Sequence, residues 1–400
     1  MAASGAAGRR KDAGGGPRHL YIHVPFCRER CDYCDFSSVA VGEPEAAGSR
    51  LDAYVEAVHV EWEIENARFG VGRLETVFVG GGTPSLLGEA RLERLLEPLA
   101  PRLNPHAEIT VETNPEDVTP EYADWAAARR LRVSLGVQSF DRRLRETLGR
   151  RAAADPETAF TRLREAGCVN LGVDLMFGLP GQTLAELEVD LEVVDHLRPE
   201  HVSCYELTIA AGTVLAARLE LGAAGRLGAD PPELPDDDCT ATMFRRIIAE
   251  LGGLGYAWYE VSNFAQAGRR CRHNVAYWRG CDYLGLGPAA VSTVGAQRRR
   301  NADDAGAYLK ALLAAPPAAP PREVEHLDPG MRARERLFLA ARTGAPVPLA
   351  ELAPALDETA IEPLADGGFI AVRGGRLRVT RKGRHVANEV CVRLFRDSSF

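Results

Sequence analysis

The sequence predicts an α/β protein with a partial (β/α)6 barrel, an additional α+β segment and a C-terminal winged-helix-like domain. Six aliphatic, β-branched runs alternate with segments of helical periodicity, which is typical of parallel βαβ units. These runs are apolar along most of their length, as expected for a sheet covered on both faces. The chain of 400 residues has room for two to three domains of about 150 residues each, so it can bury a full-sized core.

The strand-like runs lie in the first half of the chain. They cover residues 19–24, 74–80, 107–113, 131–137, 170–176 and 201–207. Helical patterns occupy the intervals, at 51–62, 88–99, 119–130, 155–166 and 183–197. In the first interval, the apolar residues from Leu51 to Trp62 recur on one helical face. We therefore expect residues 19–212 to form the barrel, with its active site in the loops that follow the strands.

The pattern changes after the sixth strand-like run. A helix at 236–251 and a strand-like segment at 256–261 predict an α+β extension associated with the barrel, over residues 213–314. The Pro-rich, apolar-poor stretch that follows predicts a linker over 315–324.

Residues 325–400 resemble a small independent module. Helical segments at 331–342, near 348–356 and near 358–366 precede two strand-like runs that flank the turn pair Gly374-Gly375. Three helices followed by a hairpin are a winged-helix pattern, and such modules often bind DNA. The hairpin region is basic, with Arg373, Arg376, Arg378, Arg381, Lys382 and Arg384. Because the helices carry no cluster of base-reading side chains, we favour a charged, solvated surface over a DNA contact.

Charge and hydropathy exclude several classes of protein. Lys and Arg number 48 against 56 Asp and Glu, a net charge of −8, which argues against a protein that coats nucleic acid or anionic membrane. No apolar run approaches the roughly 18 residues that a transmembrane helix needs. Residues 1–18 are Gly-rich and basic without an apolar core, so we expect a disordered leader on a cytoplasmic protein. A short organelle-targeting peptide is the less favoured interpretation.

The strongest chemical signal is the spacing Cys27-x3-Cys31-x2-Cys34, directly after the first strand-like run. The residues between these cysteines are polar, which favours ligands over buried apolar thiols. Zinc is the first alternative, but its sites usually pair two Cys-x2-Cys units, and no second pair exists. Three thiolates suit a [4Fe–4S] cluster with one iron open to another ligand. The remaining cysteines are scattered singly, at Cys168, Cys204, Cys239, Cys271, Cys281 and Cys391, and indicate no disulfide framework.

This cysteine spacing, with an aromatic residue before the last Cys, is the signature of the radical S-adenosylmethionine (SAM) family. The motifs YIHVPFC, VFVGGGTPS, ETNPE, SLGVQSF, LGR and VDLMFGLPGQT follow in family order. The sequence resembles the branch related to oxygen-independent coproporphyrinogen III oxidase and, within it, the radical SAM heme chaperones. The resemblance spans residues 21 to about 300, and the winged-helix-like tail follows. It implies a radical SAM barrel, a [4Fe–4S] cluster on the three cysteines, and SAM bound at the open iron.

Polar and glycine residues at the predicted strand ends suit a SAM pocket. The glycines of GGGTP, with Gly81, Gly82 and Thr83, let the backbone approach a ligand, and a phosphate loop is disfavoured because the Lys-Ser/Thr pair is missing. Each of Glu112, Gln138 and Asp174 follows or ends a strand, and their joint placement favours ligand contacts over ordinary loop hydrogen bonds. Arg150 can pair with a carboxylate. The resemblance places Tyr21 and Tyr33 near SAM at the cluster.

Several features distinguish the members of the branch. The oxidases carry a fourth cysteine at the position of Phe36 and a long N-terminal extension, whereas twenty residues precede Tyr21 here. The chaperone pattern His-Asn-x2-Tyr-Trp is present, from His273 to Trp278. A neutral imidazole can ligate heme iron, the two aromatic residues can stack on a macrocycle, and the arginines of the run 298–300 can meet propionates. One departure is Ala152, because chaperones commonly have a His two residues after the LGR arginine.

These observations leave three hypotheses. The favoured one is a chaperone that binds heme and delivers it to an apo-hemoprotein, with a [4Fe–4S] cluster and SAM and with no coproporphyrinogen dehydrogenase activity. The alternative is the oxidase itself, in which a reduced cluster cleaves SAM and the radical leads to decarboxylation of porphyrinogen propionates; such chemistry needs an electron donor. The third, a regulator that binds DNA through the C-terminal module, is disfavoured by the net negative charge.

Overall fold

The computed structural model describes residues 16–152, 154–223 and 233–396 of the chain. At its centre lie six parallel strands in the order β1-β4-β5-β6-β7-β8. They are β1 (His19–Val24), β4 (Leu74–Gly81), β5 (Leu103–Thr113), β6 (Arg132–Gln138), β7 (Leu171–Phe177) and β8 (His201–Glu206). All six predicted strands are confirmed. β5 begins four residues before its predicted start, and the others agree to within one residue.

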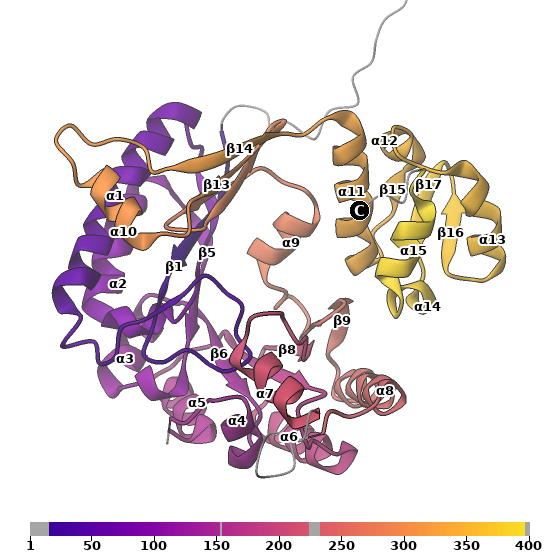
Figure 1. Cartoon of the computed structure of the whole chain (residues 1–400), viewed down its shortest axis with the longest axis horizontal. Coiled ribbons are helices and arrows are strands. Elements are labelled where there is room, and N and C mark those ends of the chain that lie inside the picture. Colours follow the sequence, from indigo (N-terminus) through magenta and orange to yellow (C-terminus); the bar gives the residue numbers. More distant parts are fainter. Residues whose placement is uncertain (1–15, 153, 224–232, 397–400) are drawn as a thin grey trace, which may run out of the picture.

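Helices join these strands and cover one face of the curved sheet (Figure 1). They are α1 (Gly48–Phe69), α2 (Gly88–Leu96), α3 (Pro120–Ala128), α4 (Arg142–Thr147), α5 (Pro156–Glu165) and α6 (Leu184–Leu197), with 3-10 turns at Pro84–Leu87, Glu97–Arg102 and Pro115–Asp117. The five predicted helices are present, and α4 is an addition. Their starts follow from capping, since Thr119 and Thr183 accept hydrogen bonds from backbone N–H groups of the first turn.

The α+β extension widens the central sheet at both edges, to twelve strands. Beside β1 lie β11 (Tyr283–Leu286), β12 (Val291–Val294), β13 (Gln297–Asn301) and β14 (Arg322–His326); beside β8 lie β10 (Asn263–Ala265) and β9 (Ala257–Glu260). β11 runs parallel to β1, and the other added strands pair antiparallel. The helices of this part are α7 (Val214–Ala223), α8 (Asp237–Gly253), α9 (Arg272–Trp278) and α10 (Ala305–Leu312). The predicted helix and strand correspond to α8 and β9.

Two sequence expectations are wrong in part. The predicted linker ends in β14, in which Arg322 pairs with Asn301 of β13, so its last residues belong to the sheet. The predicted disordered leader includes residues 16–18, which are ordered: Gly16 N–H donates to Gly70 O at 3.0 Å, and Arg18 O accepts from Glu75 N–H at 2.8 Å. In both places the backbone continues the hydrogen bonding of an adjoining strand. Residues 1–15 of that leader lie outside the described residues.

The C-terminal module has a hydrophobic core of its own, which includes Leu337, Ile370 and Leu377. Its elements are α11 (Pro329–Thr343), β15 (Val347–Pro348), α12 (Leu349–Leu352), a 3-10 turn (Glu358–Ala360), α13 (Ile361–Asp366), β16 (Ile370–Arg373), β17 (Arg376–Val379), α14 (Arg381–Arg384) and α15 (Ala387–Leu394). Gly374 and Gly375 both have positive φ, as a two-residue hairpin turn requires. The helices and the hairpin lie where the sequence predicts them, and α14 and α15 are additional.

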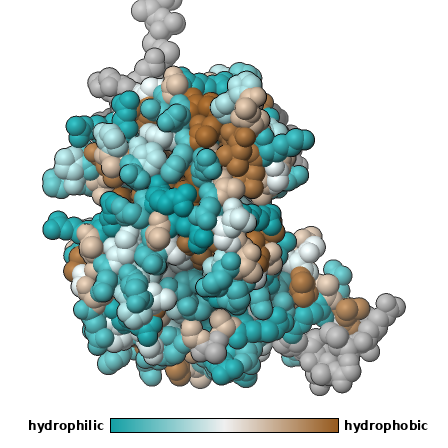
Figure 2. Space-filling view, turned by 90° about the vertical axis from the view of Figure 1, so that its left-hand side faces the viewer, coloured by the Kyte–Doolittle hydropathy of each residue, from teal (hydrophilic) through white to brown (hydrophobic). Residues whose placement is uncertain are grey.

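The main core fills the space between the sheet and its helices. It includes Ile22, Val77, Val111 and Val173 from four neighbouring strands, all fully buried. Figure 2 shows the side of the molecule that lies at the left in Figure 1, which is largely hydrophilic apart from patches of hydrophobic residues. None of the helices in the described ranges combines the length and apolar character needed to cross a bilayer.

Candidate functional site

The three cysteines lie on one loop after β1. This loop joins two short parallel strands, β2 (Phe26–Cys27) and β3 (Val39–Ala40). Cys27 is buried, whereas Cys31 and Cys34 are half-buried, and Cys34 N–H donates to Cys31 O at 3.2 Å. A Cβ atom placed at Gly82 would lie 3.0 Å from Cys27 Sγ, so this glycine keeps the space beside the sulfur open.

The polar residues between the cysteines anchor the loop. Asp32 is buried, its N–H donates to Leu148 O at 2.9 Å, and its carboxylate accepts from Arg218 at 2.8 Å. Arg28 forms ion pairs with Asp117 at 3.0 Å and with Glu43 at 2.8 Å. The loop is therefore held by its polar residues, which leaves the thiols available for ligands.

The environment of the thiols suits an iron–sulfur cluster. Burial raises the pKa of Cys31 to about 11, the nearby Cys34 and Cys27 raise it further, and Arg150 opposes the shift. These mutual effects show that the structure brings the three sulfurs together. Thiolates at such short range repel one another, and a cationic iron cluster relieves that repulsion. The donor set therefore fits a cluster that is held by Cys27, Cys31 and Cys34.

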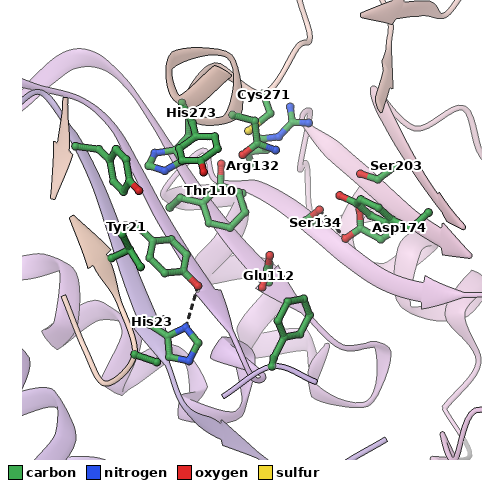
Figure 3. Close-up of a pocket in the computed structure, with 18 of the residues that line it drawn as sticks. Tyr21, His23, Thr110, Glu112, Arg132, Ser134, Asp174, Ser203, Cys271 and His273 are labelled. Atoms are coloured by element: carbon green, nitrogen blue, oxygen red, sulfur yellow. Dashed lines mark hydrogen bonds between the residues drawn. The ribbon is translucent and has the colours of Figure 1, made fainter. Parts of the chain in front are cut away.

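A cavity of about 630 Å³ opens next to this loop (Figure 3). Its lining combines Phe36 from the cysteine loop with polar side chains from β1, β5, β6 and β7 and with residues of α9. Four predicted site residues line it: Tyr21, Glu112, Asp174 and His273. The predicted SAM residues and the predicted heme ligand thus face one shared space, whose size is typical of a small-molecule site.

Glu112 and Asp174 are buried carboxyl groups at the strand ends. Glu112 Oε2 accepts the N–H of Gly81 at 2.9 Å, and Asp174 accepts the hydroxyl of Ser134 at 2.8 Å. Burial raises the pKa of Glu112 to about 8, with the negative charge of Asp174 adding to the shift, and burial also raises the pKa of Asp174. Within the described residues neither carboxyl forms an ion pair. Their arrangement favours a cationic ligand.

A second set of predicted residues lies beside the cavity and does not line it. Arg150 donates to Gly136 O and to Asn114 Oδ1, and Asn114 in turn donates to Thr83 Oγ1 at 3.2 Å. Gln138 has a positive φ, and a Cβ at Gly136 would lie 3.3 Å from its amide nitrogen. The structure thus gathers Arg150, Thr83 and Gln138 around Asn114. Asn114 is a site residue that the sequence reasoning missed, although it stands in the quoted motif ETNPE.

The two predicted tyrosines have different surroundings. Tyr21 lines the cavity, and its hydroxyl is 3.0 Å from His23 Nδ1 (Figure 3). Because His23 Nε2 lies 2.8 Å from the carbonyl oxygen of Ser37 and must donate to it, Nδ1 accepts from Tyr21. Tyr33 packs against an apolar cluster that includes Leu144 and does not line the cavity.

His273 lies at the other end of the cavity, on α9. Its Nδ1 is 2.9 Å from Thr76 Oγ1, and the same hydroxyl is 2.9 Å from His19 Nδ1. A hydroxyl carries one proton, so it donates to one ring and accepts from the other. Burial lowers the pKa of His273 to about 3, and His19 adds to that shift, so the imidazole is neutral. When His273 donates through Nδ1, its Nε2 has a free lone pair.

Of the motif around His273, the structure assigns only part to the cavity. Tyr277 lines it, whereas Trp278 packs against Tyr259 with ring centroids 5.9 Å apart. Arg300 is the member of the predicted arginine run that lines the cavity; Arg299 pairs with the buried Glu65 at 2.9 Å. The expectation that the whole run meets a ligand is therefore wrong for Arg299. Arg298, likewise, pairs with Glu325 and Glu335.

Further cavity residues were not predicted from the sequence. They are His23, Asp35, Ser37, Phe78, Thr110, Arg132, Ser134, His201, Ser203, Tyr205, Cys271, Asn274, Tyr283, Ala289 and Val291. Most come from the predicted strands, where alternate side chains face the cavity, so the alternation was an available signal for them. Arg132 is notable because it is buried and adds a positive charge to a cavity that otherwise holds carboxyls.

Comparisons with known proteins place the chain. The radical SAM superfamily matches residues 21–194. The Heme chaperone HemW of Mycobacterium tuberculosis (strain H37Rv) is 38% identical over 384 residues, which cover 94% of each chain. That of Bacillus subtilis (strain 168) is 33% identical and covers 93% of this chain and 98% of its own. The chain belongs to the HemW family.

The fold has a solved counterpart as well. Coproporphyrinogen III oxidase (HemN) from Escherichia coli matches with a TM-score of 0.78 over 95% of this chain and 90% of its own, at 23% identity. This likeness shows the radical SAM fold, which confirms the predicted fold class. Within the HemW family, the member of Escherichia coli (strain K12) is 38% identical over 70% of each chain.

Proposed function

We propose that this protein binds heme and delivers it to an apo-hemoprotein, and that it carries a [4Fe–4S] cluster and SAM. The observation that carries the proposal is the shared cavity, which has buried carboxyls near the cysteine loop and a neutral imidazole, His273, at its other end. Membership of the HemW family supports it, because every relative reported above in that family is named a heme chaperone.

Cys27, Cys31 and Cys34 would hold the cluster. When bound, the cluster supplies an iron with an open position for the amine and carboxylate of SAM. Glu112 and Asp174 would then neutralise the positive charge of SAM, since both are buried without a cationic partner in the described residues. Arg150 and Gln138, gathered around Asn114, would fix the backbone of the strand ends that surround it.

At the other end of the cavity, His273 would ligate the heme iron through Nε2. Thr76 accepts the Nδ1 proton and so selects the tautomer whose Nε2 has a free lone pair. Phe78 lies 5.3 Å from the His273 ring, and Tyr277 and Tyr283 form an edge contact at 5.5 Å, which provides aromatic walls for a flat macrocycle. Arg300, which lines the cavity, can pair with a propionate.

The oxidase alternative gains no support from the site. At the position of the fourth cysteine of the oxidases stands Phe36, a side chain 61% exposed at the cavity. We further propose a cytoplasmic location, because all nine cysteines are free, as a reducing compartment favours. An external electron donor would be required if the cluster is reduced during the cycle.

Heme titration followed by transfer tests this function. We expect the cluster-loaded protein to bind heme stoichiometrically, with a shift of the Soret band, and to pass it to an apo-hemoprotein. His273→Ala should weaken heme binding at least tenfold, whereas His106→Ala, which removes an exposed imidazole on β5, should not. Conversion of coproporphyrinogen III to protoporphyrinogen under anaerobic, reducing conditions, or the absence of heme binding, would overturn the proposal.

A further inference from the structure

A second cavity, of about 430 Å³, lies between the C-terminal module and the barrel. Its lining comes from α8, β9, the end of α11, β17 and α14. Figure 1 shows that α14 and β17 are on the side of the module that faces β9 and α8. We call this cavity the arginine cleft, after the three arginines that line it: Arg378, Arg381 and Arg384.

The arginine cleft concentrates positive charge without matching negative charge. Its lining includes no Asp or Glu, and none of its three arginines forms an ion pair within the described residues. The buried carboxylate nearest in the sheet, Glu260, is already paired with Arg342 at 2.5 Å. Like charges held together in a partly buried site are unfavourable unless a counter-charge binds there.

Arg384 is the clearest sign of a missing acceptor. Its guanidinium stacks on the indole of Trp258, 3.7 Å from the ring centroid, and Arg381 lies over the same ring at 5.9 Å. Nη1 makes one long hydrogen bond, 3.4 Å, to Trp258 O, whereas Nε and Nη2 are buried and have no hydrogen-bond partner. Buried donors without an acceptor are costly, and native proteins rarely leave them so.

We propose that the arginine cleft binds a phosphate-type oxyanion carried by a small molecule. Guanidinium groups present a planar fork of donors that matches the oxygens of a phosphate, and the weak bond of Arg384 to Trp258 O lets the side chain turn toward a better acceptor. Ile248, Tyr256 and Val379 supply an apolar wall for the rest of the ligand. The volume of the cleft is in the range typical of small-molecule sites.

The position of the arginine cleft gives the ligand a structural consequence. Trp258 belongs to β9 at the edge of the main sheet, while Arg378 and Arg381 belong to the module. A bound oxyanion would therefore bridge the module and the barrel through charge-assisted hydrogen bonds. It would also stabilise the native chain against unfolding, because only the folded protein assembles the site.

Calorimetric titration of the full-length, cluster-loaded chain with inorganic phosphate and with pyrophosphate, in chloride buffer at constant ionic strength, tests the proposal. We expect saturable binding at one site. Arg381→Gln should weaken it at least tenfold, and its exposed position makes misfolding no concern. The matched control, Arg373→Gln, removes the same charge from β16 outside the cleft and should change the affinity less than twofold.

Two further arms separate the alternatives. Arg384→Lys keeps the charge but removes the planar fork, so it should weaken phosphate binding at least fivefold with an unchanged circular dichroism spectrum. Absence of saturable binding to the wild type, or equal weakening by Arg381→Gln and Arg373→Gln, would refute the cleft. A titration with duplex DNA identifies the other source of phosphate: tight duplex binding that Arg373→Gln also abolishes would make the hairpin a nucleic-acid contact and overturn the proposal.

Discussion

Two buried polar regions of this protein differ in how their charges are matched. In the first, which we call the ion-pair cluster, Glu61 and Glu65 of α1 meet Arg299 and Arg322 of β13 and β14. Glu65 accepts from Arg299 at 2.9 Å and from Arg322 at 2.6 Å. In the second, the large cavity, Glu112 and Asp174 face each other across free space with no ion pair among the described residues.

The difference teaches how to separate structure from function in a buried charge. Glu61 accepts from Gly287 N, Tyr308 OH and the amide of Asn301, so its neighbours are already in place and leave no room for a ligand. Glu112 accepts from one backbone N–H and otherwise faces the cavity. A carboxylate matched by the protein itself holds elements together, whereas one that lacks a partner is prepared for a ligand.

The largest effect is expected at the cysteine loop beside the cavity. Cys27→Ala should abolish the cluster, because two thiolates cannot hold the roughly four irons and four sulfides of a [4Fe–4S] unit as three do. Iron and sulfide analysis with the cluster absorption measures it. Cys168→Ala, a buried thiol far along the chain, should retain the full cluster. A stable zinc ion without sulfide in the wild type would contradict the assignment.

The ion-pair cluster should respond in stability instead. Arg299→Met leaves Glu65 with one cationic partner, Arg322, and we expect a loss of about 3–5 kcal/mol in the free energy of unfolding. Urea denaturation measures it. Arg142→Met breaks an exposed pair with Glu146 and should cost no more than about 0.5 kcal/mol. Equal losses in both variants would remove the distinction between the two regions.

The pKa of Glu112 predicts how SAM binding depends on pH. In the free protein this carboxyl has a pKa of about 8, so it is mostly protonated at neutral pH. A cationic ligand favours the ionised form, and SAM affinity should therefore rise with pH by up to about tenfold per unit and level off above pH 8. Binding assays on Glu112→Gln should give a flatter profile. An identical profile in the two proteins would assign the proton to another group.

Glu112 should also affect stability, in the opposite direction. Its folded pKa lies above the unfolded value of about 4.3, so the native state binds the extra proton between pH 4.3 and 8. The unfolding free energy contributed by this group consequently falls as pH rises through that window. Glu112→Gln removes this part of the pH dependence.

The shared cavity predicts that its two ligands interfere. The residues proposed for SAM and for heme line one space of about 630 Å³, so saturating SAM should weaken heme binding by about tenfold, and heme should weaken SAM binding by the same factor. Soret titrations with and without SAM measure it. In Asp174→Asn, which binds SAM less well, the same SAM concentration should have little effect on heme. Independent dissociation constants would show that the two sites do not overlap.

The smallest effect is expected from the hydroxyl that positions His273. Thr76→Val removes its hydrogen bond to Nδ1, worth about 1 kcal/mol, and should lower heme affinity by about fivefold while shifting the Soret maximum. Thr76→Ser restores the hydroxyl and should restore both the affinity and the spectrum. A full loss of affinity in both variants would indicate a packing defect.

The sequence predicts the barrel well and the added strands poorly. Each strand of the barrel is a local apolar run, whereas β11 pairs with β1 across most of the chain, and no local pattern records that pairing. The arginine run shows a second limit. Arg298, Arg299 and Arg300 are adjacent, but a strand turns alternate side chains to opposite faces, so Arg299 is buried with Glu65 and Arg300 reaches the cavity.

The site itself is predicted in part. The cysteine spacing and the strand-end positions of Glu112 and Asp174 locate the cavity, because parallel strands end at one edge of the sheet. Thr76 and Asn114 escaped notice, since each acts by orienting another side chain, and the partner of such a residue is visible only in three dimensions.

The position of β1 in the sheet has a consequence for biosynthesis. β1 is paired on one side with β4, but its other neighbour is β11, and His19 lies opposite Tyr283. On the ribosome, the edge of β1 therefore stays open while most of the chain is made, and the cysteine loop that follows it emerges long before the sheet beside it can close. Such distant pairing slows folding and exposes strand edges to aggregation. We expect the nascent chain to depend on protection, and its iron to be installed after synthesis is complete.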